Sequence, residues 1–251
     1  MEVMITGGAN GIGKEAVKNL KDEHRVTVID KDEESLNSLE GVEKLHLDIT
    51  EQERVQKELT EIEIDILINC AGVQKQGAVE DMYIQEFEDH IYNNYIGYVN
   101  TIKACLPELR KSGGKIVNVS SIAGLSSAPF LSGYCASKHA VEGFTDSLRR
   151  ELKEIDVILV EPGRVKTGFN EEGRDNVANY ENSNYLDLYD RLLKQDIGGI
   201  TPDKAGNKLA YIALNGSKPR YTITAEAYLI SKLEKILPAR LVDLIFRKFQ
   251  R

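Results

Sequence analysis

A tyrosine and a lysine stand four residues apart in the segment from Tyr134 to Lys138, within a stretch of helical hydrophobic spacing. Residues i and i+4 lie on one face of a helix, so the phenol and the ammonium would be neighbours. A phenol with its ordinary pKa near ~10 exchanges protons poorly at neutral pH. A nearby ammonium stabilises the phenolate and lowers that pKa, which favours Tyr134 as a general acid/base. The pair alone does not define a site, because the same spacing is common on solvated helix faces.

A glycine-rich segment from Thr6 to Gly13 follows a short apolar run and precedes a helical pattern. Gly7, Gly11 and Gly13 permit a tight turn and let a pyrophosphate approach the backbone at the positive end of a helix. Their spacing differs from the usual G-x-G-x-x-G, so a glycine-rich turn without a ligand is the alternative.

Asp30 supports the nucleotide hypothesis, because it ends the second apolar run, 17 residues after Gly13. A carboxylate there accepts hydrogen bonds from the adenosine ribose hydroxyls and repels a 2′-phosphate, which favours NAD over NADP. Asn10 stands where a basic residue often contacts that phosphate, which also favours NAD. Lys31 would partly accommodate a phosphate, so NADP stays open.

The elements that position these residues follow from seven short apolar runs alternating with amphipathic segments. The runs predict strands at Val3–Ile5, Val26–Ile29, Lys44–Leu47, Ile64–Asn69, Lys115–Ser120, Val157–Glu161 and Tyr221–Thr224. The amphipathic segments predict helices at Ile12–Leu20, Glu33–Leu39, Glu51–Leu59, Ile84–Arg110, Tyr134–Lys153 and Pro202–Leu214. Thr50 and Glu53 have the spacing of a capping box, which predicts that the third helix starts from Thr50. The alternation predicts an α/β fold with a doubly wound parallel sheet.

Composition narrows the class of protein. The 251 residues carry a net charge of −8 and are 41% hydrophobic, as expected of one globular domain over residues 1–251. The acidic balance argues against a nucleic-acid partner. The three cysteines and four histidines lack metal-ligand spacing, so no metal is expected. We find no signal-peptide pattern and no run of ~20 apolar residues, and we expect a cytoplasmic protein.

Two segments stand out from this pattern. Residues 163–199 are rich in Asn, Gly and acidic residues and follow the sixth strand, which predicts an irregular substrate lid rather than a floppy loop. Residues 225–251 form a basic amphipathic segment, with apolar stripes at Leu233, Ile236 and Leu237 and at Leu241, Ile245 and Phe249. Such a segment either packs against this subunit or a neighbour, which we favour, or makes a peripheral contact with an anionic membrane.

Further motifs occur in order along the chain: Asp48-Ile49, Asn69-Cys70-Ala71-Gly72, Asn94-Tyr95-Ile96-Gly97, Val119-Ser120-Ser121, and Pro162-Gly163 followed by Thr167. With Thr6–Gly13 and Tyr134–Lys138, they make residues 1–215 closely resemble the short-chain dehydrogenase/reductase family. The resemblance implies a Rossmann-type three-layer sandwich with a seven-stranded parallel sheet. It also implies a homodimer or homotetramer joined through the long helices near 84–110 and 134–153.

The resemblance assigns roles to individual residues. Tyr134 would be the general acid/base, and Lys138 would lower its pKa and bind the nicotinamide ribose. Ser121 would orient the reacting oxygen, and Asn94 would hold a water in a proton relay. Asp48 and Ile49 would contact the adenine, and Thr167 the carboxamide. The other implied cofactor contacts are Thr6, Gly7, Asn10, Gly11, Ile12, Gly13, Asp30, Lys31, Asn69, Ala71, Gly72, Pro162, Gly163 and Val165. Cys70 is expected to be a core residue, and Ser120 to point away from the site.

The implied function is NAD(P)-dependent interconversion of a secondary alcohol and a ketone. The motif wording is nearest to the hydroxysteroid and retinol dehydrogenase branch, which suggests an apolar, steroid-, retinoid- or lipid-like substrate. Its pocket wall would come from residues 122–133, residues 73–77 and the lid, with Phe130, Leu131, Phe169 and the lid tyrosines supplying apolar surface. The lid tyrosines serve equally well as residues that pack the lid itself. A 3-oxoacyl-thioester reductase and a non-catalytic dinucleotide-binding sensor are the alternatives.

Overall fold

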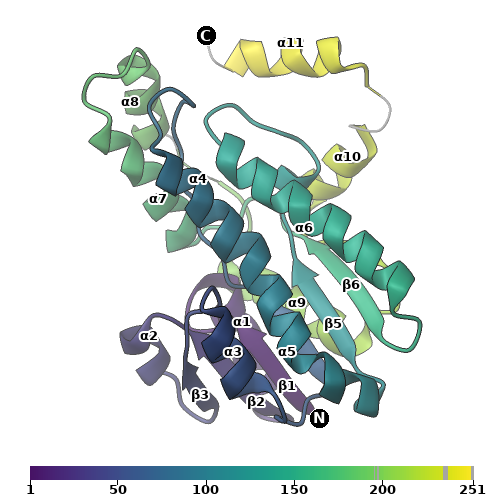
Figure 1. Ribbon diagram of the computed structural model, residues 1–251. Helices are drawn as coiled ribbons and strands as arrows, with labels where there is room; N and C mark the ends of the chain where they lie inside the picture. Colours follow the sequence, from purple (N-terminus) through teal and green to yellow (C-terminus); the bar gives the residue numbers. More distant parts are fainter. Residues whose placement is uncertain (195, 197, 234–236, 250–251) are drawn as a thin grey trace.

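The computed structural model describes residues 1–194, 196, 198–233 and 237–249. Seven parallel strands form one sheet in the order β3-β2-β1-β4-β5-β6-β7 (Figure 1). They are β1 (Glu2–Thr6), β2 (Arg25–Asp30), β3 (Glu43–His46), β4 (Ile66–Asn69), β5 (Lys115–Val119), β6 (Asp156–Glu161) and β7 (Arg220–Thr222). Each begins and ends within two residues of its predicted bounds, so the predicted seven-stranded parallel sheet is confirmed.

Alternate side chains of β1 enter two separate hydrophobic cores, because successive residues of a strand point to opposite faces. Val3 and Ile5 pack with residues of α1 (Gly11–Leu20) and α9 (Pro202–Asn215) on one face of the sheet. Met4 packs on the other face with residues of α3 (Gln52–Leu59), α5 (Gly97–Ser112) and α6 (Ser132–Glu151). The helices on both faces confirm the doubly wound, three-layer architecture.

The strand order reverses beside β1, which lies between β2 and β4. In open α/β sheets, ligands bind beyond the carboxyl ends of the strands at such a reversal. The fold therefore brings the residues that follow β1, β2, β4, β5 and β6 to one edge of the sheet, where four of the predicted motifs meet.

Two helix predictions need correction. The segment predicted as one helix over 84–110 consists of α4 (Ile84–Ile91), a π-helical stretch at Tyr92–Ile96, and α5. The short α2 (Glu33–Asn37) starts where predicted and ends two residues earlier, and α3 does not start from Thr50. The Thr50 hydroxyl donates a hydrogen bond to the Asp48 carboxylate at 2.8 Å instead of capping the helix. The prediction was wrong because Thr50 belongs to a turn closed by the Asp48 carboxylate, which also accepts from the Thr50 N–H, and α3 begins only at Gln52.

The predicted lid over 163–199 is helical rather than irregular. It holds α7 (Gly168–Asp175), a 3₁₀ turn at Asn176–Asn179, and α8 (Leu186–Lys194), while residues 195 and 197 lie outside the described part. Val177, Tyr180 and Tyr189 pack in a small core with Ala78 and Met82. Tertiary packing therefore supplies the helical stability that the composition does not.

The C-terminal segment forms α10 (Ala225–Leu233) and α11 (Ala239–Phe249), with Pro238 between them. In Figure 1 both helices, drawn in yellow, lie at the same end of the molecule as α8 and far from the amino terminus. Ile236, which the apolar stripe includes, lies outside the described residues, as do the side chains of Ile245 and Phe249. Within the described residues, no helix combines the length and the apolar run that crossing a bilayer needs.

Candidate active site

A cleft of about 590 Å³ runs along the carboxyl ends of the central strands. Most of the predicted site residues line it: Gly7, Asn10, Gly11, Ile12, Gly13, Asp30, Lys31, Asp48, Ile49, Ala71, Gly72, Ser121, Tyr134, Lys138, Pro162, Gly163, Val165 and Thr167. The fold thus brings together, in one continuous wall, motifs that lie up to 160 residues apart in the chain.

Thr6, Asn69 and Asn94 do not line the cleft, and all three are fully buried behind its wall. The Thr6 hydroxyl accepts hydrogen bonds from the backbone of Cys70 and Ala71, at 3.2 and 3.3 Å. The Asn69 amide donates to Asn118 at 2.9 Å and accepts from Thr101 at 2.7 Å. The structure therefore places Thr6 and Asn69 as supports of the cleft wall, not as groups that face a cofactor.

The glycine turn leaves no room for side chains at two positions. Gly7 has a positive φ of 67°, and a Cβ on it would lie 2.5 Å from Ala71 Cα. A Cβ on Gly13 would lie 2.1 Å from the Gly7 carbonyl oxygen, well inside van der Waals contact. The turn therefore holds β1, α1 and the segment after β4 in close contact, with its backbone open to the cleft.

Four charged residues surround the end of the cleft beyond β2. The Asp30 carboxylate accepts hydrogen bonds from the backbone N–H groups of Ala9 (3.0 Å) and Asp32 (3.1 Å). The Lys31 ammonium donates to Asn93 at 2.9 Å and lies 3.9 Å from the Asp48 carboxylate. Asp32 also lines this end of the cleft, so three carboxylates face one ammonium that already has partners.

Tyr134 stands on the first turn of α6, with its phenol in the cleft. Burial raises the pKa of Tyr134 above its ordinary value, and a hydrogen bond with the Ser121 side chain lowers it by a smaller amount. The Ser121 oxygen also accepts a hydrogen bond from the Ala123 N–H at 3.1 Å, which fixes the serine at the end of β5. Ser121 and Tyr134 therefore form a hydroxyl pair at the cleft.

Lys138 lies one turn further along α6 and is 4% exposed. Its ammonium donates a hydrogen bond to the Val119 carbonyl at 3.0 Å and lies 5.9 Å from the centre of the Tyr134 ring. Burial lowers the pKa of Lys138 to about 8. The sequence predicts that Lys138 lowers the pKa of the phenol, but in the protein alone burial dominates and raises it. The difference arises because the spacing shows the neighbouring charge but not the desolvation of the phenol.

Asn94 lies in the π-helical stretch, where its side chain is buried and makes three hydrogen bonds to protein atoms. Its carbonyl oxygen accepts from the Val73 N–H at 2.7 Å, and its amide donates to the Val73 carbonyl at 3.0 Å and to Ser137 at 2.9 Å. These contacts join the segment after β4 to α6. The predicted water contact of this side chain stays a prediction.

The other end of the cleft is apolar near the phenol. Phe169 of α7 packs against Tyr134 with ring centres 6.1 Å apart, and Leu131 belongs to the same small cluster. Tyr180 and Tyr189 point elsewhere: their hydroxyls donate to the carboxylates of Glu86 and Asp81. Of the two interpretations of the lid tyrosines, packing within the lid is the one that the structure supports.

Phe130 of the loop after β5 packs against the lid residues Tyr185 and Tyr189 and does not line the cleft. Cys70 lines the cleft half-buried rather than lying wholly in the core, and burial raises the pKa of its thiol to about 11. Ser120 is buried, with its hydroxyl near Glu142, but it also lines the cleft, so the prediction that it points away from the site is not confirmed.

Sequence reasoning missed Arg220, the first residue of β7. Its guanidinium donates to Glu142 of α6, to Glu161 at 2.8 Å and to Asp146 at 2.7 Å. The signal was present, because Glu142 and Asp146 stand at i and i+4 on one helix face and require a cation. It also missed His90, a buried residue whose ring lies edge-on to Tyr134 at 6.2 Å.

The described residues hold no group of three or more His, Cys, Asp or Glu side chains that could bind a metal ion. The cleft instead offers what a dinucleotide needs: an open glycine backbone at a helix start, carboxylates at one end, and a phenol, a serine and an ammonium at the other.

Comparisons with known proteins agree with this arrangement. Residues 2–178 match the family model described as short chain dehydrogenase. The chain is 31% identical to the 3-ketodihydrosphingosine reductase of Bacteroides thetaiotaomicron, in an alignment that covers 98% of this chain and 97% of that protein.

Two solved structures share the fold. A short chain dehydrogenase from Burkholderia cenocepacia, in complex with NADP, has a TM-score of 0.76 and 25% identity, covering 94% of this chain and 93% of that one. A short chain dehydrogenase/reductase from Burkholderia phymatum, in complex with NAD, has a TM-score of 0.78 and 21% identity, covering 92% of each chain. The same architecture therefore accepts either dinucleotide.

Proposed function

The chain belongs to the short-chain dehydrogenase family of NAD(P)-dependent oxidoreductases, and from that premise we propose that it interconverts a secondary alcohol and a ketone with Tyr134 as general acid/base. When bound, the nicotinamide ring accepts a hydride from the alcohol carbon or returns it to the ketone carbon. The observation that carries the proposal is the grouping of Tyr134, Ser121 and Lys138 around one point of the cleft.

Each of the three side chains has a distinct task. Tyr134 takes the proton of the alcohol hydroxyl, or gives it to the ketone oxygen in the reverse direction. Ser121 holds the same oxygen in place, since its hydroxyl already lies beside the phenol. Lys138 keeps a positive charge next to the phenol, which favours the phenolate, and it donates to the nicotinamide ribose. Phe169 and Leu131 cover this point and limit the access of water.

We propose NAD as the preferred dinucleotide. The glycine turn fits a pyrophosphate, because its backbone lies open to the cleft and the Cβ positions at Gly7 and Gly13 are filled by other atoms. A 2′-phosphate would meet the carboxylates of Asp30 and Asp32. Lys31 offers little compensation, since its ammonium is held by Asn93 and Asp48.

For the substrate we propose a long-chain, lipid-like ketone or the corresponding alcohol. Phe169 of the lid and Ala123 and Leu131 of the 122–131 loop pack in one apolar cluster with Tyr134. The relative from Bacteroides thetaiotaomicron is named for a ketone derived from dihydrosphingosine, a long-chain amino alcohol. The lid carries six acidic residues between Glu171 and Asp190, which disfavours anionic thioesters.

Replacing Tyr134 by Phe tests the mechanism. The ring stays and the proton donor disappears, so we expect turnover of a long-chain ketone with NADH to fall at least ~100-fold. Dinucleotide affinity, measured by NADH fluorescence, should stay within about threefold of the wild-type value. Tyr95→Phe is the matched control, because Tyr95 packs against Phe144 away from the cleft and should keep its turnover. A Tyr134→Phe protein that retains a tenth of the wild-type turnover would refute the assignment.

Replacing Asp30 by Ala tests the choice of dinucleotide. The wild-type protein should bind NADH more tightly than NADPH, and the variant should lose ~10-fold or more in NADH affinity while NADPH affinity rises, because one carboxylate no longer repels the 2′-phosphate. Fluorescence titration with both dinucleotides measures this. Tighter binding of NADPH by the wild-type protein would show that Lys31 outweighs the three carboxylates.

A further inference from the structure

The two C-terminal helices carry apolar side chains that no other part of the described chain covers. On α11, Leu241 and Leu244 are 43% and 53% exposed. On α10, Tyr228, Leu229 and Leu233 are also exposed. Scattered single apolar residues are ordinary on a surface, but these five lie on two consecutive helices at one end of the molecule (Figure 1).

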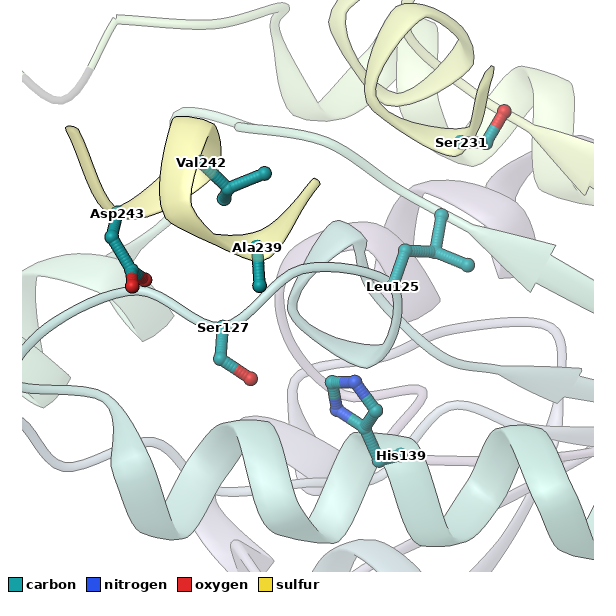
Figure 2. A pocket seen from close by; sticks show the side chains of 7 residues that line it. All are labelled: Leu125, Ser127, His139, Ser231, Ala239, Val242 and Asp243. Atoms are coloured by element: carbon teal, nitrogen blue, oxygen red, sulfur yellow. The ribbon is translucent and has the colours of Figure 1, made fainter. Parts of the chain in front are cut away.

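The inner side of α11 does not pack into a core either. A cavity of about 420 Å³ separates it from α6 and the loop that follows β5. Figure 2 shows Ala239, Val242 and Asp243 of α11 above this cavity, with Ser127 and His139 below it. Four of the seven residues that line it are polar or charged. The sequence analysis favours packing against this subunit or a neighbour, and packing against this subunit does not account for the exposed leucines of α11.

The charge of the C-terminal segment indicates which partner covers the exposed apolar residues of α10 and α11. Residues 229–251 hold six bases and two acids, a net charge of +4, which leaves −12 for the rest of the chain. Arg240 and Lys232 are exposed among the apolar residues, and the Lys232 ammonium lies 5.5 Å from the centre of the Tyr228 ring. Bases, leucines and an amphipathic tyrosine on short helices are the composition of an interfacial membrane segment.

The segment lies beside the substrate end of the cleft. Arg164, which lines the cleft, forms an ion pair at 3.2 Å with Glu226 at the start of α10. The loop after β5 lies between the two hollows: Ile122 and Leu131 line the cleft, and Leu125 and Ser127 line the cavity under α11. A surface that binds α10 and α11 would therefore face the substrate end of the site.

We propose that α10 and α11 form a docking surface for an anionic phospholipid bilayer. The exposed leucines and Tyr228 enter the interface between headgroups and acyl chains, and Lys232 and Arg240 pair with lipid phosphates. The acidic remainder of the chain is repelled by the same surface, which fixes the orientation of the protein. This inference concerns binding and does not depend on the proposed reaction.

Sedimentation of the full-length protein with vesicles tests the proposal. We expect binding to vesicles of phosphatidylglycerol and phosphatidylcholine in equal amounts, and at least ~10-fold weaker binding to phosphatidylcholine alone. The double variant Leu241→Glu/Leu244→Glu should lose at least ~10-fold in binding to the anionic vesicles, and Arg240→Glu should lose several-fold. Raised salt should weaken binding of the wild-type protein.

Matched controls lie on other helices. Tyr211→Glu changes an exposed apolar residue of α9, and Lys57→Glu changes an exposed base of α3. Both should bind vesicles like the wild type. The proposal fails if the wild-type protein does not sediment with anionic vesicles, or if the α11 variants bind as well as the controls. If, instead, the double variant converts an oligomer to a smaller species in gel filtration without any vesicle binding, a second copy of this chain covers the face and the proposal is also overturned.

Discussion

Two cations, Lys138 of α6 and Arg220 of β7, lie at the α6 helix, and their surroundings differ in charge. The Arg220 guanidinium forms ion pairs with three carboxylates, those of Glu142, Asp146 and Glu161. Lys138, one turn before Glu142, is 4% exposed and has no carboxylate within 4 Å among the described residues. Its hydrogen bond goes to a neutral carbonyl, that of Val119.

The number of paired carboxylates distinguishes a cation that stabilises the fold, Arg220, from one whose charge remains available in the cleft, Lys138. Burial lowers the pKa of Arg220, but its bonds to Glu142 and Asp146 more than restore it and leave the pKa raised. Burial also lowers the pKa of Lys138, and no comparable partner offsets it, so the pKa falls to about 8. A carboxylate beside Lys138 would neutralise the charge that the phenol and a ribose need. Leaving the ammonium without one costs stability and keeps the charge available.

Among the variants that test this comparison, we expect Arg220→Met to have the largest effect on stability. The variant leaves three buried or half-buried carboxylates around an apolar side chain, so the free energy of unfolding at pH 7 should fall by about 3 kcal/mol. Urea denaturation followed by circular dichroism measures it. Arg54→Met is the matched control, because Arg54 also bonds two carboxylates but on an exposed surface, and should cost under about 1 kcal/mol. Equal losses in the two variants would remove the distinction between the two kinds of cation.

Lys138→Met should act in the opposite direction on stability. Removing a buried charge whose pKa falls from 10.5 to about 8 should raise the free energy of unfolding at pH 7, by at most about 3 kcal/mol, less the lost bond to Val119. Turnover should fall at least ~100-fold, since the phenol loses its neighbouring charge. Thermal denaturation measures the change in the free energy of unfolding, and the rate of NADH oxidation measures the turnover. A variant that is less stable than the wild type would mean that Lys138 holds the fold, as Arg220 does.

The same contrast marks what could be predicted from the sequence. The cleft follows from local signals: β-branched runs give the strands, and Gly7 and Gly13 stand where the backbone leaves no room for a Cβ. Tyr134 and Lys138 are neighbours through helical periodicity alone. These features depend on residues close together in the chain, so the seven strands and most of the cleft wall were predictable.

Features that depend on distant partners were not. Arg220 meets carboxylates 59 to 78 residues away, and Tyr180 meets Glu86 across 94 residues. The lid helices need that packing, because Asn, Gly and Asp form helices poorly on their own. Thr6 and Asn69 belong to motifs that line the cleft, yet their side chains turn into the core, because alternation along a strand sends only some residues of a motif to the cleft.

The pH dependence of stability gives the smallest and most specific effect. In the unfolded chain Lys138 keeps its proton up to pH 10.5, whereas in the folded protein it loses the proton above about 8. Between these values the unfolded state binds more protons, so the free-energy cost of burying Lys138 is complete below pH 8 and shrinks as pH rises toward 10.5. Other groups also titrate in this range, so the quantity to follow is the difference in unfolding free energy between Lys138→Met and the wild type. We expect that difference to shrink by about 1 kcal/mol from pH 7 to pH 9, whereas the difference between Arg220→Met and the wild type should stay constant. A Lys138 difference that is also constant over this range would show that the ammonium is paired in solution, and the contrast between the two cations would no longer hold.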